Sequence, residues 1–414
     1  MRVYLRTAVF LLVECCLLPC LSWAQEPMRL SLQEAIQQAL THNPQALAAT
    51  ARVAKARATL SGVTSFDDPM LSLVHHEGRN TGGLDEDVLL TQTIPLGDKR
   101  RQAIHVARSE LEAALADQAA VRRDLIYNVT TAYYQALRAD ADSNIAAEGL
   151  QLAQEFLKTA QTQFQAGDVA HSNVIRSQIA LASAQQTLSV AQTEKANAYA
   201  ALANVIGLPA NTPLLLTDKL VAPAPIQARL ADLETMALQN RPEIRSAQAL
   251  LQARLAALHG ARIETQPDLF VEFRHNPLGG PDPEGDSVRV GVTFPLVDWG
   301  KNRADRQSAL AAYNEQAALL ADEERGVRLE VETAYRNLQE AFTVLASFQT
   351  GRLQRAQELL DMERTGYANR AVSYLELLDA QQTYLTEEEN FAHALADCNL
   401  AVAALQHAVG GDIR

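Results

Sequence analysis

The sequence predicts a mainly helical protein that consists of two copies of one repeat and contains a small amount of β-structure. Three observations predict this fold class. The 414 residues are 48% hydrophobic but only 5% aromatic, which is typical of long helices packed side by side. Segments of the first half recur in the second half. Isolated stretches such as Ser287 to Leu296 alternate apolar and polar residues, the period of a strand with one apolar face.

The N-terminal segment, residues 1–24, is predicted to be a cleavable secretory signal. It begins with positive charge, continues as an apolar run and ends in a Ser22-x-Ala24 pattern. The apolar run is too short for a convincing membrane-spanning helix. Once the signal is removed, Cys398 is the only thiol, so neither an internal disulfide nor a cysteine cluster for a metal is expected.

Charge and hydropathy exclude some classes of partner. The formal net charge is -13 at pH 7, which argues against nucleic acid as a partner. After residue 24, no apolar run approaches the ~18 residues of a membrane-spanning helix. If the protein enters a membrane, we expect it to do so as a barrel of strands.

The two halves of the chain are copies with small insertions. The first half contains HNPQALAATARVAKARATL from His42, and the second half contains the related NRPEIRSAQALLQARLAAL from Asn240. Another pair is TTAYYQAL from Thr130 and ETAYRNLQ from Glu332, again about 200 residues apart. The predicted divisions are the signal peptide 1–24, the first repeat 25–206, a proline-rich linker 207–227, the second repeat 228–410 and a tail 411–414.

Each repeat is predicted to run through a helix, a β-hairpin, a long helix, a break and a last helix. The first helix has about 36 residues, the long one about 70 and the last about 38, so the long helix spans roughly 100 Å. The two shorter helices can therefore stack end to end beside the long one. Aspartate is a preferred N-cap and glycine a preferred stop. The predicted bounds are Leu30–Ser65 and Ala228–Glu264 for the first helices, starts at Asp98 and Asp298 for the long helices, and ends at Gly207 and Gly410 for the last helices.

Four stretches are predicted to be strands, each with one apolar face. Transmembrane barrels need at least about eight strands, so the sheet of one chain cannot close on itself. Three chains would supply twelve strands, and we therefore predict a trimer whose strands form a twelve-stranded β-barrel. A small soluble sandwich with a buried apolar face is the alternative. The predicted strands are Met70–His76, Val88–Ile94, Leu269–His275 and Ser287–Phe294.

In such a barrel the alternation assigns the two faces of the sheet. The apolar side chains would face lipid, and the charged side chains would line a wet lumen. The predicted lipid-facing residues are Val288, Val290, Val292 and Phe294, and the predicted lumen residues are Glu272, Arg274 and Arg289.

The opening LSLQEAIQQALTHNP, the segment FPLVDWGKNRA and the duplicated plan resemble the TolC-type outer membrane efflux proteins, in the style of their heavy-metal, CzcC-like branch. The resemblance covers essentially the whole mature chain. It implies a passive homotrimeric conduit in the outer membrane of a Gram-negative bacterium, with a long periplasmic portion in which the coiled-coil helices of the two repeats form an α-barrel. The implied partners are a periplasmic adaptor, or membrane fusion protein, an inner-membrane RND-type pump and outer membrane lipid. Several members of the family are lipoproteins, which makes Cys20 a candidate site for lipid attachment.

The resemblance also places the periplasmic tip in the turns that follow the two long helices. Residues expected to make contacts there are Phe164, Gly167, Ser172, Asn173, Tyr367 and Arg370. Arg370 stands where the family has glycine, so we expect Asn369 to take the left-handed conformation instead. An acidic pair in the second turn, Glu376 and Asp379, is expected to narrow the tunnel entrance. The alternative is two ordinary solvated carboxylates.

Cations at the start of both long helices support a membrane position. The helix macrodipole disfavours positive charge at an N-terminus. Phospholipid headgroups at the inner rim of the barrel would explain why lysine and arginine nevertheless occur there. Tryptophan is common at such interfaces. The predicted rim residues are Lys99, Arg100, Arg101, Trp299, Lys301 and Arg303.

Enzymatic chemistry is poorly supported by the sequence. It contains no glycine-rich phosphate loop and no His-x-x-x-His metal spacing, and no cofactor is expected. His75 and His76 are adjacent in a strand and so point to opposite faces. The resemblance to the CzcC-like branch implies heavy-metal cations as the substrates. An exit duct for drugs or for type I protein secretion is the alternative, and a periplasmic adaptor or structural protein is a weaker one.

Overall fold

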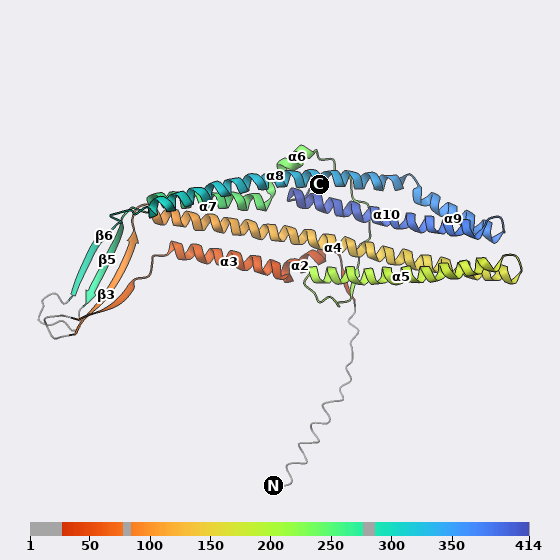
Figure 1. Ribbon diagram of the computed structural model, residues 1–414, viewed down its shortest axis with the longest axis horizontal. Coiled ribbons are helices and arrows are strands. Elements are labelled where there is room, and N and C mark those ends of the chain that lie inside the picture. The colour runs from red at the N-terminus through yellow and green to blue at the C-terminus, as the bar shows by residue number, and fades with distance from the viewer. Residues whose placement is uncertain (1–26, 78–83, 276–285, 414) are drawn as a thin grey trace, which may run out of the picture.

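The computed structural model describes residues 27–77, 84–275 and 286–413 as a long rod of helices. The sheet lies at one end of the rod, and the turns between long and last helices lie together at the other end (Figure 1). The predicted signal peptide, Cys20 and most of both hairpin loops lie outside the described residues, as do the side chains of His75 and His76.

The first copy follows the predicted order of elements. Its long helix has 67 residues, close to the predicted length. The elements are β1 (Met28–Leu30), α2 (Leu32–His42), α3 (Pro44–Thr64), β2 (Met70–Glu77), β3 (Leu84–Pro95), α4 (Lys99–Gln165), α5 (His171–Val205) and, in the predicted linker, β4 (Leu214–Leu216).

The second copy repeats the order. Both chain halves end in a helix of similar length, 35 residues in α5 and 36 residues in α10. The elements are α6 (Leu230–Asn240), α7 (Pro242–Ile263), β5 (Asp268–His275), β6 (Asp286–Thr293), α8 (Lys301–Gln349), α9 (Arg352–Ala368) and α10 (Tyr374–Val409).

The prediction of one continuous first helix in each copy is wrong. In both copies the helix is interrupted before a proline that opens the next helix, Pro44 or Pro242. The preceding residues, Asn43 and Arg241, are extended, with ψ of 129° and 126°. Proline's ring excludes the helical conformation from the residue before it, so each first helix divides into two.

The prediction of a second uninterrupted long helix is also wrong. α8 ends at Gln349 and α9 begins at Arg352, with Gly351 between them at φ 82°. That left-handed conformation suits glycine and cannot continue a right-handed helix.

The predicted end-to-end stacking is confirmed. α2, α3 and α5 all pack along α4, while α6, α7 and α10 pack along α8 (Figure 1). The copies are joined because α4 also packs against α7 and α10.

In each copy, the residue at the joint between the two parts of the first helix, Asn43 or Arg241, is hydrogen-bonded to the end of the last helix. Asn43 Nδ2 donates to the Val205 carbonyl at 2.8 Å, and Arg241 Nη1 donates to the Ala408 carbonyl at 3.2 Å. Gly410 follows the last helix with φ 78°, and a Cβ there would lie 3.3 Å from the Cα of Arg241. The joint and the glycine stop therefore form one unit at the middle of the rod.

A small core surrounds this middle region. Tyr133 is fully buried, and its hydroxyl lies 3.0 Å from the Leu30 carbonyl and 2.9 Å from Asp218 Oδ2. β1 and β4 pair in parallel beside it, with Met28 opposite Leu214. The linker is thus anchored to the first repeat. Among the described residues, no helix is both long enough and apolar enough to cross a membrane.

Candidate channel surfaces

The four predicted strands form one antiparallel sheet in the order β2-β3-β5-β6. Its register gathers the apolar side chains of neighbouring strands on one face, with Val290 opposite Val271 and Val288 opposite Phe273. Val290 is 65% exposed and Leu73 of β2 is 78% exposed. In the described part of the chain nothing covers this face, which does not support the soluble-sandwich alternative.

Of the predicted lipid-facing residues, Val288, Val290 and Val292 lie on that apolar face of β6. Phe294 follows directly after the strand and is also exposed. Their contact with lipid stays a prediction.

The predicted lumen residues lie on the opposite face and form ion pairs across strands. Glu272 of β5 pairs with Arg289 of β6, its partner in register. Arg274 Nε lies 2.8 Å from Asp87 Oδ1 of β3, whose side chain is buried. These ion pairs connect neighbouring strands on the polar face of the sheet. That this face lines the lumen of a barrel stays a prediction.

The predicted rim cations of the first copy divide between two environments. Lys99 Nζ lies 3.1 Å from Asp268 Oδ1 and its side chain is only 13% exposed, so it ties the start of α4 to the start of β5. Arg100 donates to the Thr64 carbonyl at 2.6 Å. These two charges are engaged within the chain.

The other predicted rim residues point outward. Arg101 and Arg303 are exposed, and Lys301 pairs one turn along its helix with Asp305 at 2.9 Å. Trp299 is 93% exposed. An indole so exposed beside cations is typical of a membrane interface, and contact with headgroups stays a prediction.

At the first tip, α4 ends in a glycine turn. The Gly167 amide donates to the Phe164 carbonyl at 2.9 Å and the Asp168 amide to the Gln163 carbonyl at 2.9 Å, with Gly167 at φ 79°. This pair of bonds is the Schellman motif, which needs a left-handed residue at the first position after the cap.

The second tip has the same motif with arginine in place of glycine. The Arg370 amide donates to the Tyr367 carbonyl at 3.1 Å and the Ala371 amide to the Gly366 carbonyl at 2.8 Å. The expectation that Asn369 would be left-handed is wrong: its φ is -90°, and Arg370 itself has φ 63°. The motif's hydrogen bonds fix the left-handed position, so the residue there must adopt it.

The two tips are connected to each other. Arg370 forms an ion pair with Asp168 of the first turn, and Gln163 Nε2 donates to the Tyr367 carbonyl at 3.1 Å. Tyr367 is 4% exposed and packs on Tyr374 with ring centroids 5.6 Å apart. Tyr367 is thus buried within its own chain at the tip, and a contact with an adaptor stays a prediction.

The remaining tip residues lie at the surface. Phe164 is half-exposed beside the His171 ring, 5.1 Å between centroids. Ser172 is exposed and Asn173 is half-buried. Contact of these residues with an adaptor stays a prediction.

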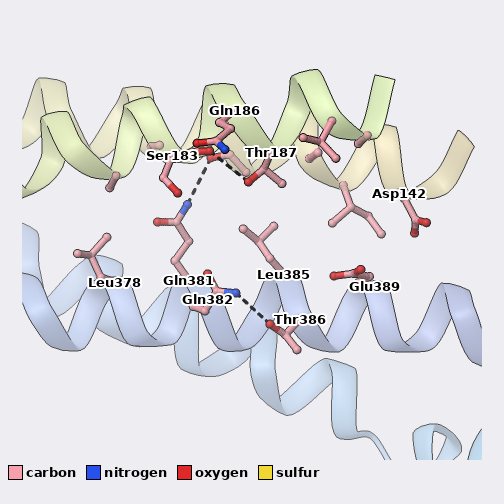
Figure 2. Close-up of a pocket in the computed structure, with 18 of the residues that line it drawn as sticks. Asp142, Ser183, Gln186, Thr187, Leu378, Gln381, Gln382, Leu385, Thr386 and Glu389 are labelled. Carbon is pink, nitrogen blue, oxygen red and sulfur yellow. Dashed lines mark hydrogen bonds between the residues drawn. The ribbon is translucent and has the colours of Figure 1, made fainter. Parts of the chain in front are cut away.

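The predicted entrance carboxylates line a groove of about 1100 Å³ between α5 and α10, with α4 at its floor (Figure 2). Glu376 also closes a capping box: the Ser373 amide donates to its Oε2 at 2.6 Å, and this hydrogen bond lowers the pKa of Glu376. Asp379 is exposed one turn further on. Glu376 therefore caps its helix, and the constriction role of the pair stays a prediction.

Sequence reasoning missed a cluster of three residues, two of which, Asp142 and Glu389, line this groove. Asp142 of α4 and Glu389 and His393 of α10 bring one ligand atom each within 4.8 Å of one another. The motif His-x-x-x-His does not occur here, but Glu-x-x-x-His on a helix is a recognisable pattern and contains two of the three residues. The third member lies in the other repeat.

A second polar cluster joins both copies at the middle of the rod. Arg241 Nη1 lies 2.5 Å from Glu330 Oε2, and His407 lies between Asp124 (2.8 Å) and Glu330 (3.4 Å). The hydrogen bond from His407 and then that from Arg241 lower the pKa of Glu330 to about 2, although burial opposes the shift. These contacts link α4, α8 and α10.

A family model and several relatives match most of the chain. A family model described as outer membrane efflux protein matches residues 35–208 and again residues 233–411. The chain is 30% identical over 348 residues to protein CyaE of Bordetella pertussis, a match that covers 78% of this chain and 73% of CyaE.

One further relative is named for the export of pyoverdine and another for resistance to metals. The pyoverdine export outer membrane protein OpmQ of Pseudomonas aeruginosa is 26% identical over 75% of this chain and 65% of its own length. The cobalt-zinc-cadmium resistance protein CzcC of Cupriavidus metallidurans is 25% identical over 77% of this chain and 75% of its own length.

The fold is that of solved outer membrane channels. The crystal structure of the outer membrane protein VceC from Vibrio cholerae superposes with a TM-score of 0.79 at 21% identity, covering 92% of this chain and 97% of VceC. Proteins of this kind are passive channels rather than enzymes, and they reside in the outer membrane. The chain belongs to the outer membrane efflux protein family.

Proposed function

We propose that three copies of this chain form a passive export conduit and that divalent metal cations are its main substrates. The observation that carries the assembly is the sheet: one face exposes a row of valines and leucines, and the outer edges of β2 and β6 have no pairing strand among the described residues. An exposed apolar face with open edges is stable only beside lipid and further strands.

Pairing of β6 with β2 of the next copy removes every open edge and gives twelve strands. Val288, Val290, Val292 and Phe294 then face lipid, while Glu272, Arg274 and Arg289 line the lumen. The engaged cations Lys99 and Arg100 brace the junction of helices and sheet, and the outward residues Arg101, Trp299, Lys301 and Arg303 meet the headgroups.

At the other end of the rod, the tips meet a periplasmic adaptor that connects the conduit to an inner-membrane RND-type pump. Phe164, Ser172 and Arg370 are exposed there and are available to a partner. Three copies of Glu376 and Asp379 around one axis form a negative entrance that concentrates cations.

Two observations support metal cations as the substrate class. Relatives are named cobalt-zinc-cadmium resistance protein and nickel-cobalt-cadmium resistance protein. The chain is also acidic, with a net charge of -13, as suits a path for cations. The name of OpmQ favours a second candidate, export of an organic molecule.

Deletion of the gene in its native host tests the substrate class. We expect lower minimal inhibitory concentrations of cobalt, zinc and cadmium salts, restored by the intact gene supplied on a plasmid. Hydrophobic drugs and the secretion of large proteins are assayed in the same strains. Sensitivity to drugs alone, or loss of a secreted protein with unchanged metal resistance, contradicts the metal assignment.

A further inference from the structure

We propose that Asp142, Glu389 and His393 bind one divalent metal cation in the wall of the groove between α4, α5 and α10. The inference rests on the proposed function only in the choice of metals, since zinc, cobalt and cadmium are the cations in question. It adds a resident site on the helical part of the conduit.

The geometry of the three side chains suits a metal. Glu389 and His393 are four positions apart in the sequence, so they lie on the same face of α10. His393 Nε2 lies 2.9 Å from Asp142 Oδ1 and 3.9 Å from Glu389 Oε1. Donors that bind one Zn²⁺ at about 2.0–2.2 Å are roughly 3.3 Å apart in a tetrahedron, so small rotations bring all three into place.

The donor set selects the class of cation. One imidazole with two carboxylates suits Zn²⁺, Co²⁺ and Ni²⁺, and no soft thiolate is present to favour Cu⁺. Asp142 and Glu389 face each other across the groove from different helices (Figure 2). The groove of about 1100 Å³ gives a cation a path to them and leaves room for water at a fourth position.

Arg138 keeps the cluster in its metal-free form. Its Nη2 donates to His393 Nδ1 at 2.9 Å, so the ring proton is on Nε2, which donates to Asp142 at 2.9 Å. A metal at Nε2 requires that proton to move to Nδ1, where Arg138 can no longer donate. Asp397 Oδ1, already 3.6 Å from Arg138 Nη1, receives the displaced guanidinium. Metal binding thus exchanges one partner of Arg138 for another.

Equilibrium dialysis of the detergent-extracted full mature chain against Zn²⁺, with elemental analysis, tests the site. We expect one Zn²⁺ per chain. H393Q and E389Q should weaken the affinity at least tenfold, because each removes one of three protein ligands. E332Q is the control, since Glu332 is a surface carboxylate of α8 that pairs with Arg336, and it should bind as the wild type does.

Arg138 and Asp397 offer a test that a merely structural cluster would fail. R138Q should tighten Zn²⁺ binding because the competing donor is gone, and D397N should weaken it because Arg138 loses its second partner. Co²⁺ substitution should give visible d–d absorption in the wild type that H393Q abolishes. Circular dichroism checks that every variant retains the helical content of the wild type.

Three outcomes overturn the inference: no bound Zn²⁺ in the wild type, binding unchanged by H393Q and E389Q, or equal loss of binding in E332Q. The proposed function fails separately. If deletion of the gene lowers metal resistance but the purified wild type binds no Zn²⁺, the conduit stands and the site falls. If Zn²⁺ binds as described but deletion of the gene leaves metal resistance unchanged, the metal site is supported and the proposed substrate class is contradicted.

Discussion

Arg370 occupies a backbone conformation that costs a side-chain-bearing residue about 1 kcal/mol or more. It is the single non-glycine residue with positive φ in the described ranges. Its counterpart Gly167 meets the same requirement without a Cβ. The ion pair of Arg370 with Asp168 offsets part of the cost, although an exposed pair contributes only about 0.2–1 kcal/mol.

Substitutions at Arg370 separate the backbone from the ion pair. R370A keeps the strain and loses the pair, so its melting temperature should fall below that of the wild type. R370G loses the pair but relieves the strain, and should melt near the wild type. D168N, which removes the pair alone, is the control. Thermal melting by circular dichroism measures all three, and equal melting of R370A and R370G would contradict the strain argument.

The carboxylate of Glu330 makes the middle of the rod sensitive to acid. Its pKa in the folded chain is about 2, below the ordinary value of 4.5, chiefly because His407 and then Arg241 hydrogen-bond to it. A depressed pKa stabilises the fold above about pH 4.5, and that contribution is lost as the pH falls towards 2. Because the side chain is 41% exposed, we expect about 1–2 kcal/mol after solvent screening.

E330Q should therefore melt well below the wild type at pH 7, and the difference should shrink as the pH falls from 4.5 towards 2. E332Q is the control on the same helix, since Glu332 pairs only with Arg336 one turn away on the surface. It should change the melting temperature little at any pH. If the difference in melting temperature between E330Q and the wild type did not change with pH, the charge of Glu330 would not be its cause.

At the scale of the element, periodicity and duplication predict long helices well and their interruptions poorly. The start of α4 and the ends of α5 and α10 were predicted from the aspartate before each long helix, the glycine stops and the duplication. The joints at Pro44 and Pro242 were missed because the helical pattern resumes after one residue. The break at Gly351 has no counterpart in α4, so comparing the copies could not reveal it.

The close packing of α4 on α10 depends on Gly149. A Cβ at this position would lie 3.0 Å from Cδ1 of Leu385, and Gln381 Nε2 donates to the Gly149 carbonyl at 3.4 Å. Gly62 in α3 has nothing within 4 Å of the equivalent point. The two helical glycines thus differ in surroundings and not in secondary structure.

Alanine at a helical glycine stabilises by about 1 kcal/mol when nothing is in the way. G62A should raise the melting temperature by a few degrees. G149A should raise the melting temperature less than G62A does, or lower it, because Leu385 must move. G149V should lower the melting temperature clearly, because the methyl groups of valine reach further. Melting curves of the three variants under identical conditions check this. If G149V and G62A both stabilised the protein, the helices would not be in close contact here.

At the scale of the whole molecule, the sequence predicts the faces of the sheet but not the sites between helices. Alternation alone separates Val290 from Arg289, and the register agrees. The cluster of Asp142 with Glu389 and His393 joins residues of different repeats, and only the packing of α4 on α10 brings them together. Local patterns carry no information on such distant contacts.

The proposed assembly makes a sharp prediction for the apolar face. Val290 lies in the middle of β6 and is 65% exposed in the single chain. If this face meets lipid, arginine there costs about 2–4 kcal/mol per copy near the bilayer midplane. The trimer carries this cost three times, so V290R should remove the heat-modifiable trimer from the outer membrane fraction.

T293R is the matched control because the same side chain is placed on the same strand but on the other face, opposite Asp268. An arginine there meets a carboxylate and water instead of lipid, so T293R should assemble as the wild type does. The readout is the trimer band of unheated membrane samples on a gel, with total expression measured after heating. If V290R assembled as well as T293R, the valine row would face something other than lipid, and threefold closure of the sheet would lose its physical reason.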